Sequence, residues 1–169
     1  MASDVIVRPA RPADQAAMGR LGAMLVREHH DFDPQRFIAP LPRLPERYGI
    51  FLVSQIERTE MIVLVAERDE AVVGYAYAGL EGNDYMALRG PAGVLYDLVV
   101  DPDHRRHHVG SKLLDTALAE LTRLGAPRVV LFTAEKNHVA QAMFAGAEVR
   151  RTMIEMTREL SGETEGAAR

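Results

Sequence analysis

The chain has 169 residues, of which 47% are hydrophobic and 26% charged, an ordinary composition for a globular protein. Its net charge of −4 provides no general basic field, so neither nucleic acid nor an anionic membrane is expected as a partner. Without cysteine it has no disulfide, thiolate nucleophile or cysteine-bound metal. Its first residues do not resemble a secretory signal, and no apolar run reaches the roughly 20 residues of a membrane span, so a cytoplasmic location is expected.

The first third of the chain predicts one strand and two helices. Residues 5–8 are a short β-type run, and apolar residues at helical spacing then predict a helix over residues 11–29. Four prolines within residues 31–45 exclude a continuous helix and predict an extended loop. A second helix is expected from residue 45 to about residue 58.

The middle of the chain predicts three strands. Residues 61–66 are a buried type of strand, and a polar turn over residues 68–71 joins it to a strand over residues 72–80, which gives a hairpin. A loop follows over residues 81–91. The third strand spans residues 94–100 and ends at an Asp-Pro pair.

The last third predicts two helices and two strands. An apolar stripe indicates a helix over residues 109–124, followed by a strand over residues 129–132. Asn137 is a candidate N-cap for a short helix that ends near residue 145. Residues 149–158 alternate apolar and polar side chains and predict a final, half-exposed strand.

Three consecutive strands beside a strand–helix–strand unit predict an α/β domain with a mixed sheet and helices on both faces. Residues 1–160 are expected to form this single domain. Residues 161–169 are small and charged, and we expect a disordered tail there.

The turn between the third strand and the long helix concentrates positive charge in an otherwise acidic chain. Amide N–H groups at a helix start have no internal partners, and the helix dipole makes that end positive. Such an end binds phosphate. The basic residues around it are His104, Arg105, Arg106, His107 and His108. The turn therefore predicts a site for a phosphate or pyrophosphate, and the alternative is a solvated basic loop before an ordinary helix.

This region resembles motif A of the GNAT acetyltransferases. The resemblance lies in Val99-Val100-Asp101-Pro102 and in the run from His104 to Leu114, where Arg105, Val109, Gly110, Leu113 and Leu114 match. A second stretch, with Asn137, Ala140, Met143 and Phe144, resembles the family's later cofactor helix. The resemblance is specific over residues 94–144 and follows the element order over residues 5–160.

The resemblance implies a three-layer GNAT-like fold whose mixed central sheet splays to admit the arm of acetyl-CoA, the expected co-substrate. Backbone groups of Leu98 and Val100 are expected to bind the pantetheine arm, and a backbone N–H near Leu98 or Val99 is expected to face the developing oxyanion. Asn137 is expected near the arm and Phe144 near the thioester sulfur. The cofactor-binding residues implied are Leu98, Val99, Val100, Arg105, Arg106, His107, His108, Val109, Gly110, Ser111, Asn137 and Phe144.

The sequence departs from the family pattern in three respects. The family commonly has glycine where this chain has Arg106 and His108, and glycine allows a close backbone approach and unusual dihedral angles. It often has tyrosine at Phe144, and that tyrosine can protonate the departing thiolate, whereas phenylalanine cannot. The Gly-Phe pair that usually ends this helix is replaced by Glu148 and Val149.

Two carboxylates are candidates for the general base. Asp97 is the first choice because it precedes the cofactor stretch on an otherwise apolar strand, although it could instead orient substrate or make a structural hydrogen bond. Glu81, at the end of the preceding strand, is the second choice, with a simple turn carboxylate as the alternative.

Histidines supply two further candidate groups. His29, His30, Asp31 and Asp33 leave the first helix and could supply a base, recognise a polar substrate or form a solvated helix end. The histidines of the basic turn have a spacing that clusters imidazoles, but no carboxylate is placed to join them, so no metal is expected.

The function predicted is acetyl transfer from acetyl-CoA to a primary amine by direct attack, with a small molecule or a peptide as acceptor and a homodimer compatible with the family. One alternative is a catalytically silent acyl-CoA-binding module with a regulatory or partner-binding role. Another is a nucleotide-binding domain of a different fold, which the absence of a P-loop and of a G-x-G-x-x-G run disfavours.

Overall fold

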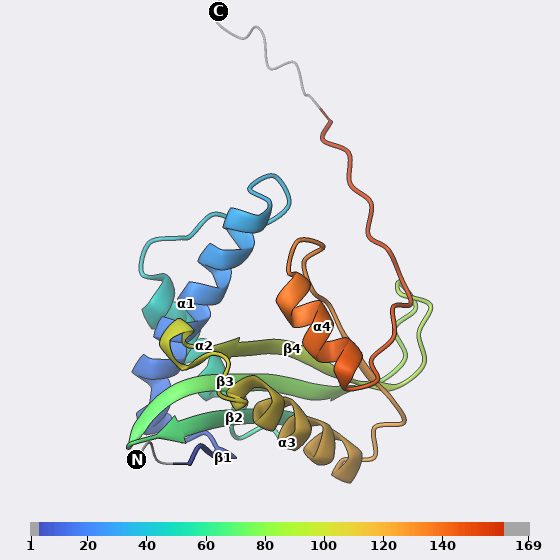
Figure 1. Cartoon of the computed structure of the whole chain (residues 1–169). Helices are drawn as coiled ribbons and strands as arrows, with labels where there is room; N and C mark the ends of the chain where they lie inside the picture. The colour runs from blue at the N-terminus through green and yellow to red at the C-terminus, as the bar shows by residue number, and fades with distance from the viewer. Residues whose placement is uncertain (1–3, 161–169) are drawn as a thin grey trace, which may run out of the picture.

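A five-stranded mixed sheet lies at the centre of the computed structural model, which describes residues 4–160 (Figure 1). The strands follow chain order, with three antiparallel pairings and a parallel one between the last two. They are β1 (Ile6–Pro9), β2 (Met61–Arg68), β3 (Ala71–Glu81), β4 (Ala92–Val100) and β5 (Val129–Leu131). The helices are α1 (Gln15–Phe32), α2 (Leu44–Gln55), α3 (Val109–Arg123) and α4 (His138–Gly146), with short 3-10 turns at Pro12–Asp14 and Pro102–His104. Within the part described, no helix has the length and apolar character needed to cross a bilayer.

Side chains that alternate along the strands build a hydrophobic core on each face of the sheet. In β2, Leu64 and Ala66 pack with α3 and α4, whereas Val63 and Val65 pack with α1 and α2. Successive residues of a strand point to opposite faces, so a strand buried on both sides reads as one continuous apolar run. The predicted mixed α/β fold with helices on both faces is confirmed.

Helices α1 and α2 approach each other closely because glycines lie at their contact. A Cβ atom at Gly19 would come within 2.0 Å of the carbonyl oxygen of Pro45. One at Gly22 would come within 2.3 Å of the ring of Tyr48. The absence of these side chains lets the Tyr48 ring lie against α1, which fixes its direction toward the sheet.

Two irregularities in β4 shape the edge at which the site lies. A bulge puts Tyr96 between the residues paired with β3, since Asp97 pairs with Tyr77 and Leu95 with Ala78. The parallel pairing with β5 covers only residues 93–95 of β4. Beyond this point no described strand pairs with that edge of β4, so the sheet opens as the family resemblance implies.

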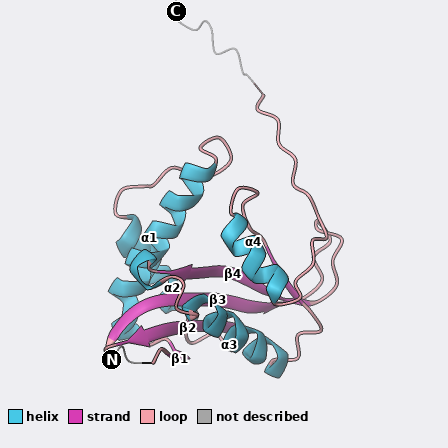
Figure 2. Ribbon diagram, viewed as in Figure 1, coloured by secondary structure: helices cyan, strands magenta, loops and turns pink. Residues whose placement is uncertain are grey.

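The predicted final strand is wrong. Residues 149–158 form no strand, and Figure 2 shows the chain after α4 as a loop that extends away from the sheet. Ile154 and Met156, which suggested a buried face, are 85% and 89% exposed. The only polar side-chain contacts described for this segment join Arg151 to Gln141 and Glu155 to Arg36. Apolar and polar side chains therefore alternate in this segment, but no neighbouring strand pairs with it to form a β-ladder. The predicted tail at residues 161–169 lies outside the described residues.

Helix boundaries differ modestly from those predicted. Helix α1 starts after a 3-10 turn and runs three residues past the predicted end, to Phe32. Helix α2 ends at Gln55 rather than near residue 58. The intervening proline-rich segment is irregular, as its prolines predict.

Candidate active site

The open edge of β4 exposes backbone groups toward β5. The amide of Asp101 donates to the carbonyl oxygen of Val73 on β3 at 2.9 Å. Alternate residues of a strand direct their backbone N–H and C=O groups to the same side, so those of Val99 also point to β3. The backbone groups of Leu98 and Val100 consequently face the opening. Of these, the carbonyl oxygen of Val100 accepts a hydrogen bond from Nε of Arg105 at 3.0 Å. The side chain of Val99 is buried on the α1–α2 face of the sheet.

The start of α3 carries a row of unpaired amides. None of the backbone N–H groups from Arg106 to Ser111 has a hydrogen-bond acceptor among residues 4–160, and the side chain of His108 does not cap the helix. Arg106 and His108 have φ values of 64° and 59°, in the left-handed region. This conformation costs a residue with a side chain about 1–2 kcal/mol relative to its right-handed form, and it explains why glycine suits both positions.

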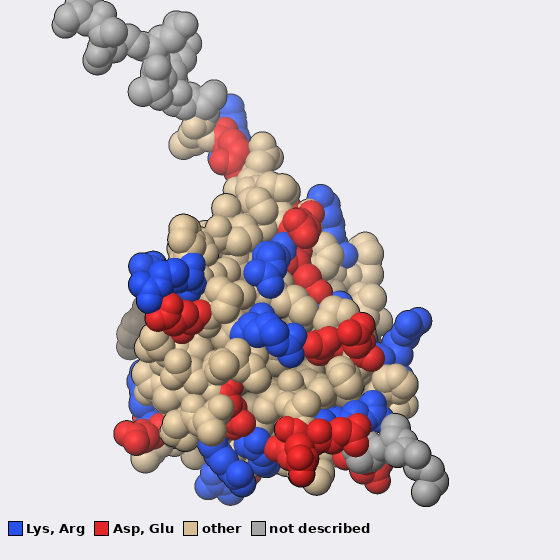
Figure 3. Space-filling view, turned by 90° about the vertical axis from the view of Figure 1, so that its left-hand side faces the viewer, with Lys and Arg blue, Asp and Glu red and all other residues tan. Residues whose placement is uncertain are grey.

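The cationic side chains of this turn contribute less to an anion site than the amides. Arg105 is engaged, because it donates to Glu28 on α1 as well as to Val100. Arg106, His107 and His108 are exposed. On the face drawn in Figure 3, basic and acidic side chains adjoin each other without a broad basic patch. No cluster of three or more histidine or acidic side chains suited to a metal ion occurs within the described part of the chain.

A groove between α3 and α4 adjoins the row of amides. Its volume is about 380 Å³. Gly110 lies close to it, where a Cβ atom would stand 3.2 Å from the sulfur of Met143. The groove is lined by Ser111, Leu114, Asp115, Ala142, Met143, Gly146 and Ala147. A ligand held by the amides therefore has space to continue between the two helices.

Helix α4 carries the other two residues expected at the cofactor. The side chain of Asn137 accepts a hydrogen bond from the amide of Ala140 at 3.1 Å, which confirms Asn137 as the N-cap. Phe144 is 8% exposed and packs in the core shared with α3. Its side chain carries no hydroxyl that could protonate a leaving group.

Asp97 is held by two tyrosines from different elements. The hydroxyl groups of Tyr48 on α2 and Tyr75 on β3 both donate to its Oδ2, at 2.7 and 2.9 Å. Its second oxygen, Oδ1, accepts no hydrogen bond within residues 4–160 and is not sealed from solvent. Burial raises the pKa of Asp97, while the two hydroxyl groups and the charge of His29 act in the opposite direction. The carboxylate is thus fixed in direction, with one oxygen available.

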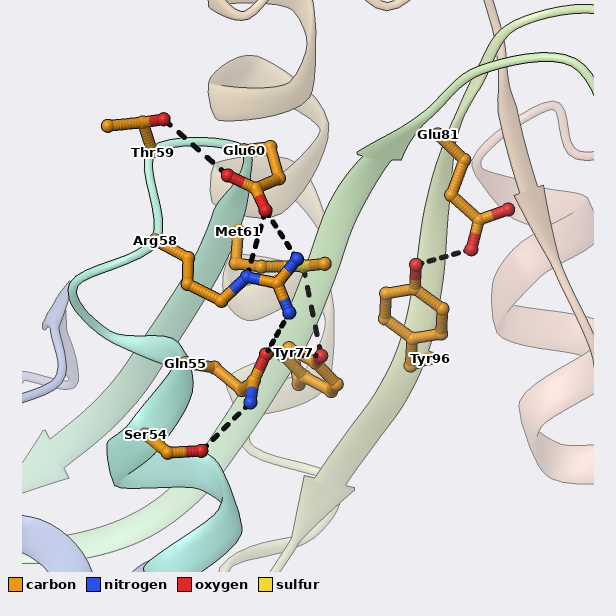
Figure 4. A network of polar contacts seen from close by, with 9 residues as sticks. All are labelled: Ser54, Gln55, Arg58, Thr59, Glu60, Met61, Tyr77, Glu81 and Tyr96. Atoms are coloured by element: carbon orange, nitrogen blue, oxygen red, sulfur yellow. Dashed lines mark hydrogen bonds and ion pairs between the residues drawn. The ribbon is translucent and has the colours of Figure 1, made fainter.

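Glu81 lies on the same face of the sheet but is fully engaged. Its Oε1 accepts from the hydroxyl of Tyr96 at 2.5 Å (Figure 4). Its Oε2 accepts from Arg89, also at 2.5 Å. The β4 bulge brings Tyr96 to the face that Asp97 occupies, and its ring stacks on that of Tyr77. An ion-paired carboxylate is a weaker candidate for a base than Asp97.

The histidines at the end of α1 brace the loop that follows. Nδ1 of His29 donates to the carbonyl oxygen of Leu25 at 2.9 Å, and its ring contacts Phe37 edge-on. Nδ1 of His30 donates to the carbonyl oxygen of Phe37 at 3.1 Å. Lys136, in the loop before α4, donates to the carbonyl oxygen of Phe32. The end of α1 is therefore tied to the segment that follows β5, beside the open edge of the sheet.

Sequence reasoning missed four tyrosines on this face of the sheet, of which two contact Asp97. Tyr75 and Tyr77 alternate along β3 and so share a face, a signal that was available from the period of the strand. The position of the Tyr48 ring depends on how α1 and α2 pack, and that of Tyr96 depends on the bulge in β4. Neither feature leaves a pattern in the sequence.

Comparison with known proteins gives a family match and a set of similar structures. The model of the acetyltransferase (GNAT) family matches residues 24–147. No curated protein sequence matches significantly. A mutant protein from Bacillus halodurans has a TM-score of 0.76 at 19% identity, with coverage of 92% of this chain and 99% of that one.

Two other similar structures are of named N-acetyltransferases. Aminoglycoside N-acetyltransferase AAC(6′)-Iy in complex with CoA has a TM-score of 0.72 at 15% identity, over 96% of this chain and 97% of that one. A GCN5-related N-acetyltransferase from Ralstonia eutropha JMP134 has a TM-score of 0.70 at 22% identity, over 94% and 100%. At these identities the likeness establishes the fold.

Proposed function

The chain belongs to the acetyltransferase (GNAT) family, and we propose that it transfers an acetyl group from acetyl-CoA to a primary amine by direct attack. The observation that carries this proposal is the carboxylate of Asp97, held by two tyrosine hydroxyls immediately before the open edge of β4. Proteins of the same fold have been crystallised with CoA and with acetyl-CoA, which supports the choice of co-substrate.

The open edge and the row of amides fit such a co-substrate. The backbone groups of Leu98 and Val100 can pair with the amides of a pantetheine arm, as an added strand would. The amides from Arg106 to Ser111 can bind its pyrophosphate. The groove between α3 and α4 leaves room for the remainder. Acetyl-CoA supplies the acetyl group as a thioester.

Asp97 and the neighbouring backbone provide the chemistry that the transfer needs. The amine nitrogen forms a bond to the carbonyl carbon while the carbon–sulfur bond breaks. Oδ1 of Asp97 accepts the proton that the amine loses, and the N–H of Leu98, which faces the opening, stabilises the charge on the carbonyl oxygen. The thiolate takes its proton from water, because Phe144 has none to give, and a thiol pKa of about 8.5 makes it an adequate leaving group.

Substitution of the base tests this assignment. Asp97→Asn keeps an acceptor for both tyrosines but removes the basic oxygen, so kcat/KM should fall by about 10²- to 10⁴-fold. Glu120→Gln, at an exposed ion pair on α3, is a matched control and should behave as the wild type. Wild-type activity in Asp97→Asn would remove Asp97 as the base.

Cofactor binding is tested separately by calorimetry. Gly110→Trp places a bulky ring at the start of α3, so we expect acetyl-CoA affinity to fall at least about tenfold. Gly90→Trp is the control and should bind normally, because a Cβ atom added there would meet no atom within 4 Å other than those of its chain neighbours. Binding without turnover across a broad panel of amines would favour the silent acyl-CoA-binding module.

A further inference from the structure

We propose that three aromatic rings beside Asp97 bind a second, positively charged group of the acceptor, a specificity that rests on the proposed acetyl transfer. The rings belong to Phe51, Tyr77 and Tyr96 and are called the aromatic shelf. Tyr96 stacks on Tyr77 with 4.8 Å between ring centroids, and Phe51 meets Tyr77 edge-on at 5.6 Å. The shelf is thus one continuous surface assembled from α2, β3 and β4.

The shelf is open to solvent on the face where Asp97 lies. Tyr96 and Phe51 are 37% and 47% exposed, whereas Tyr77 is buried beneath them. Because of the bulge, the side chains of Tyr96 and Asp97 lie on the same face of the sheet although the two residues are consecutive. An amine that reaches Asp97 therefore approaches over the same face of the sheet as a group that binds the ring of Tyr96.

The charge around Tyr96 favours a cation. The hydroxyl of Tyr96 donates to Glu81, and Arg89 contacts both Glu81 and Asp84. Two carboxylates thus share one guanidinium. The side chain of Arg89 is only 13% exposed, compared with 37% and 39% for the two acids, so an incoming ligand meets the carboxylates first.

The far end of the shelf is neutral. Arg58 pairs with Glu60 and donates to Gln55, whose side-chain oxygen also accepts from the hydroxyl of Tyr77 (Figure 4). The acidic side chains therefore lie at the Tyr96 end of the shelf. A cationic group over the ring of Tyr96 therefore has Glu81 beside it.

Two physical effects select a cation over a neutral group here. A cation over the face of an aromatic ring is attracted by the ring quadrupole. The hydroxyl of Tyr96 donates to a carboxylate, which increases the electron density of that ring. A neutral apolar group at the same place would displace water from Glu81 and Asp84 without offsetting their excess negative charge. The surface therefore discriminates by charge and not by apolar area alone.

A matched pair of acceptors tests the inference. (3-Aminopropyl)trimethylammonium and 4,4-dimethylpentylamine have the same shape and differ only in the charge of the terminal group. We expect the wild type to favour the cation by about 2- to 30-fold in kcat/KM, counted per uncharged amine. Tyr96→Leu should abolish most of that ratio, and Tyr96→Phe, which keeps the ring, should retain most of it. An unchanged ratio in Tyr96→Leu would overturn the proposal.

A binding measurement separates this inference from the proposed activity. Pentyltrimethylammonium, which has no primary amine, is titrated calorimetrically into the protein loaded with acetyl-CoA. Binding that Tyr96→Leu weakens supports the aromatic shelf even if no acceptor is acetylated, in which case only the proposed activity fails. Turnover of both acceptors without preference, together with no binding of pentyltrimethylammonium, refutes the shelf while the activity stands. Circular dichroism melts of each variant confirm that it is folded.

Discussion

Removal of the Tyr48 hydroxyl should raise the pKa of Asp97 and move the acidic limb of the pH–rate profile upward. This hydroxyl donates to Oδ2 of Asp97 at 2.7 Å, beside the donation from Tyr75. A hydrogen bond to a charged group contributes about 1.5–3 kcal/mol, and one pH unit corresponds to about 1.4 kcal/mol. Because the bond favours the ionised carboxylate, its loss in Tyr48→Phe should raise the pKa by about 1 to 2 pH units.

The assay is kcat/KM measured from acidic to neutral pH and expressed per uncharged amine, which removes the ionisation of the substrate from the comparison. Tyr48→Phe and Tyr75→Phe should each move the acidic limb up, and Asp97→Asn should abolish it. Tyr85→Phe removes a hydroxyl from an exposed residue without a contact to Asp97 and should leave the limb in place. An acidic limb at the same pH in the wild type and both tyrosine variants would refute the reasoning.

Three further predictions concern stability, each measured by urea unfolding. Gly22→Ala forces a methyl group against the Tyr48 ring, so the free energy of unfolding should fall by about 1–3 kcal/mol, and no loss would contradict the close approach. Asp14→Asn should cost about 2 kcal/mol at pH 7, because the hydrogen bonds from Arg8 lower the pKa of Asp14. That stabilisation is present above the unfolded pKa of about 3.9 and is lost as the pH falls further. The free energies of unfolding of wild type and variant should therefore converge in acid, and a difference that is constant with pH would contradict the prediction. His108→Gly relieves a left-handed φ of 59° and should gain about 1 kcal/mol, whereas a loss would argue against that conformation.

The order of elements and the turn before α3 could be predicted from the sequence because both depend on local signals. Apolar periodicity marks each strand and helix, and Asn137 marks the start of α4. The prediction that amides at the start of α3 are unpaired follows from helix geometry alone. The ion pair of Arg105 could not be predicted, because its partner Glu28 lies 77 residues away on α1.

The environment of Asp97 could not be predicted, since it joins elements that are far apart in the chain. The Tyr48 ring reaches Asp97 only because Gly22 admits it against α1. The position of Tyr96 depends on a bulge that no residue type marks. Alternation around Ile154 predicted a strand, but a strand also needs a neighbouring edge, which periodicity does not report.

The most direct test of acetyl transfer at the open edge of β4 is product analysis with acetyl-CoA and a panel of primary amines. Mass spectrometry of the amine and thiol detection of CoA are measured in one reaction. Equal amounts of N-acetylated amine and CoA, both sharply reduced in Asp97→Asn, are the predicted result. Release of CoA without acetylated amine, or tight binding of acetyl-CoA with neither product, would contradict it.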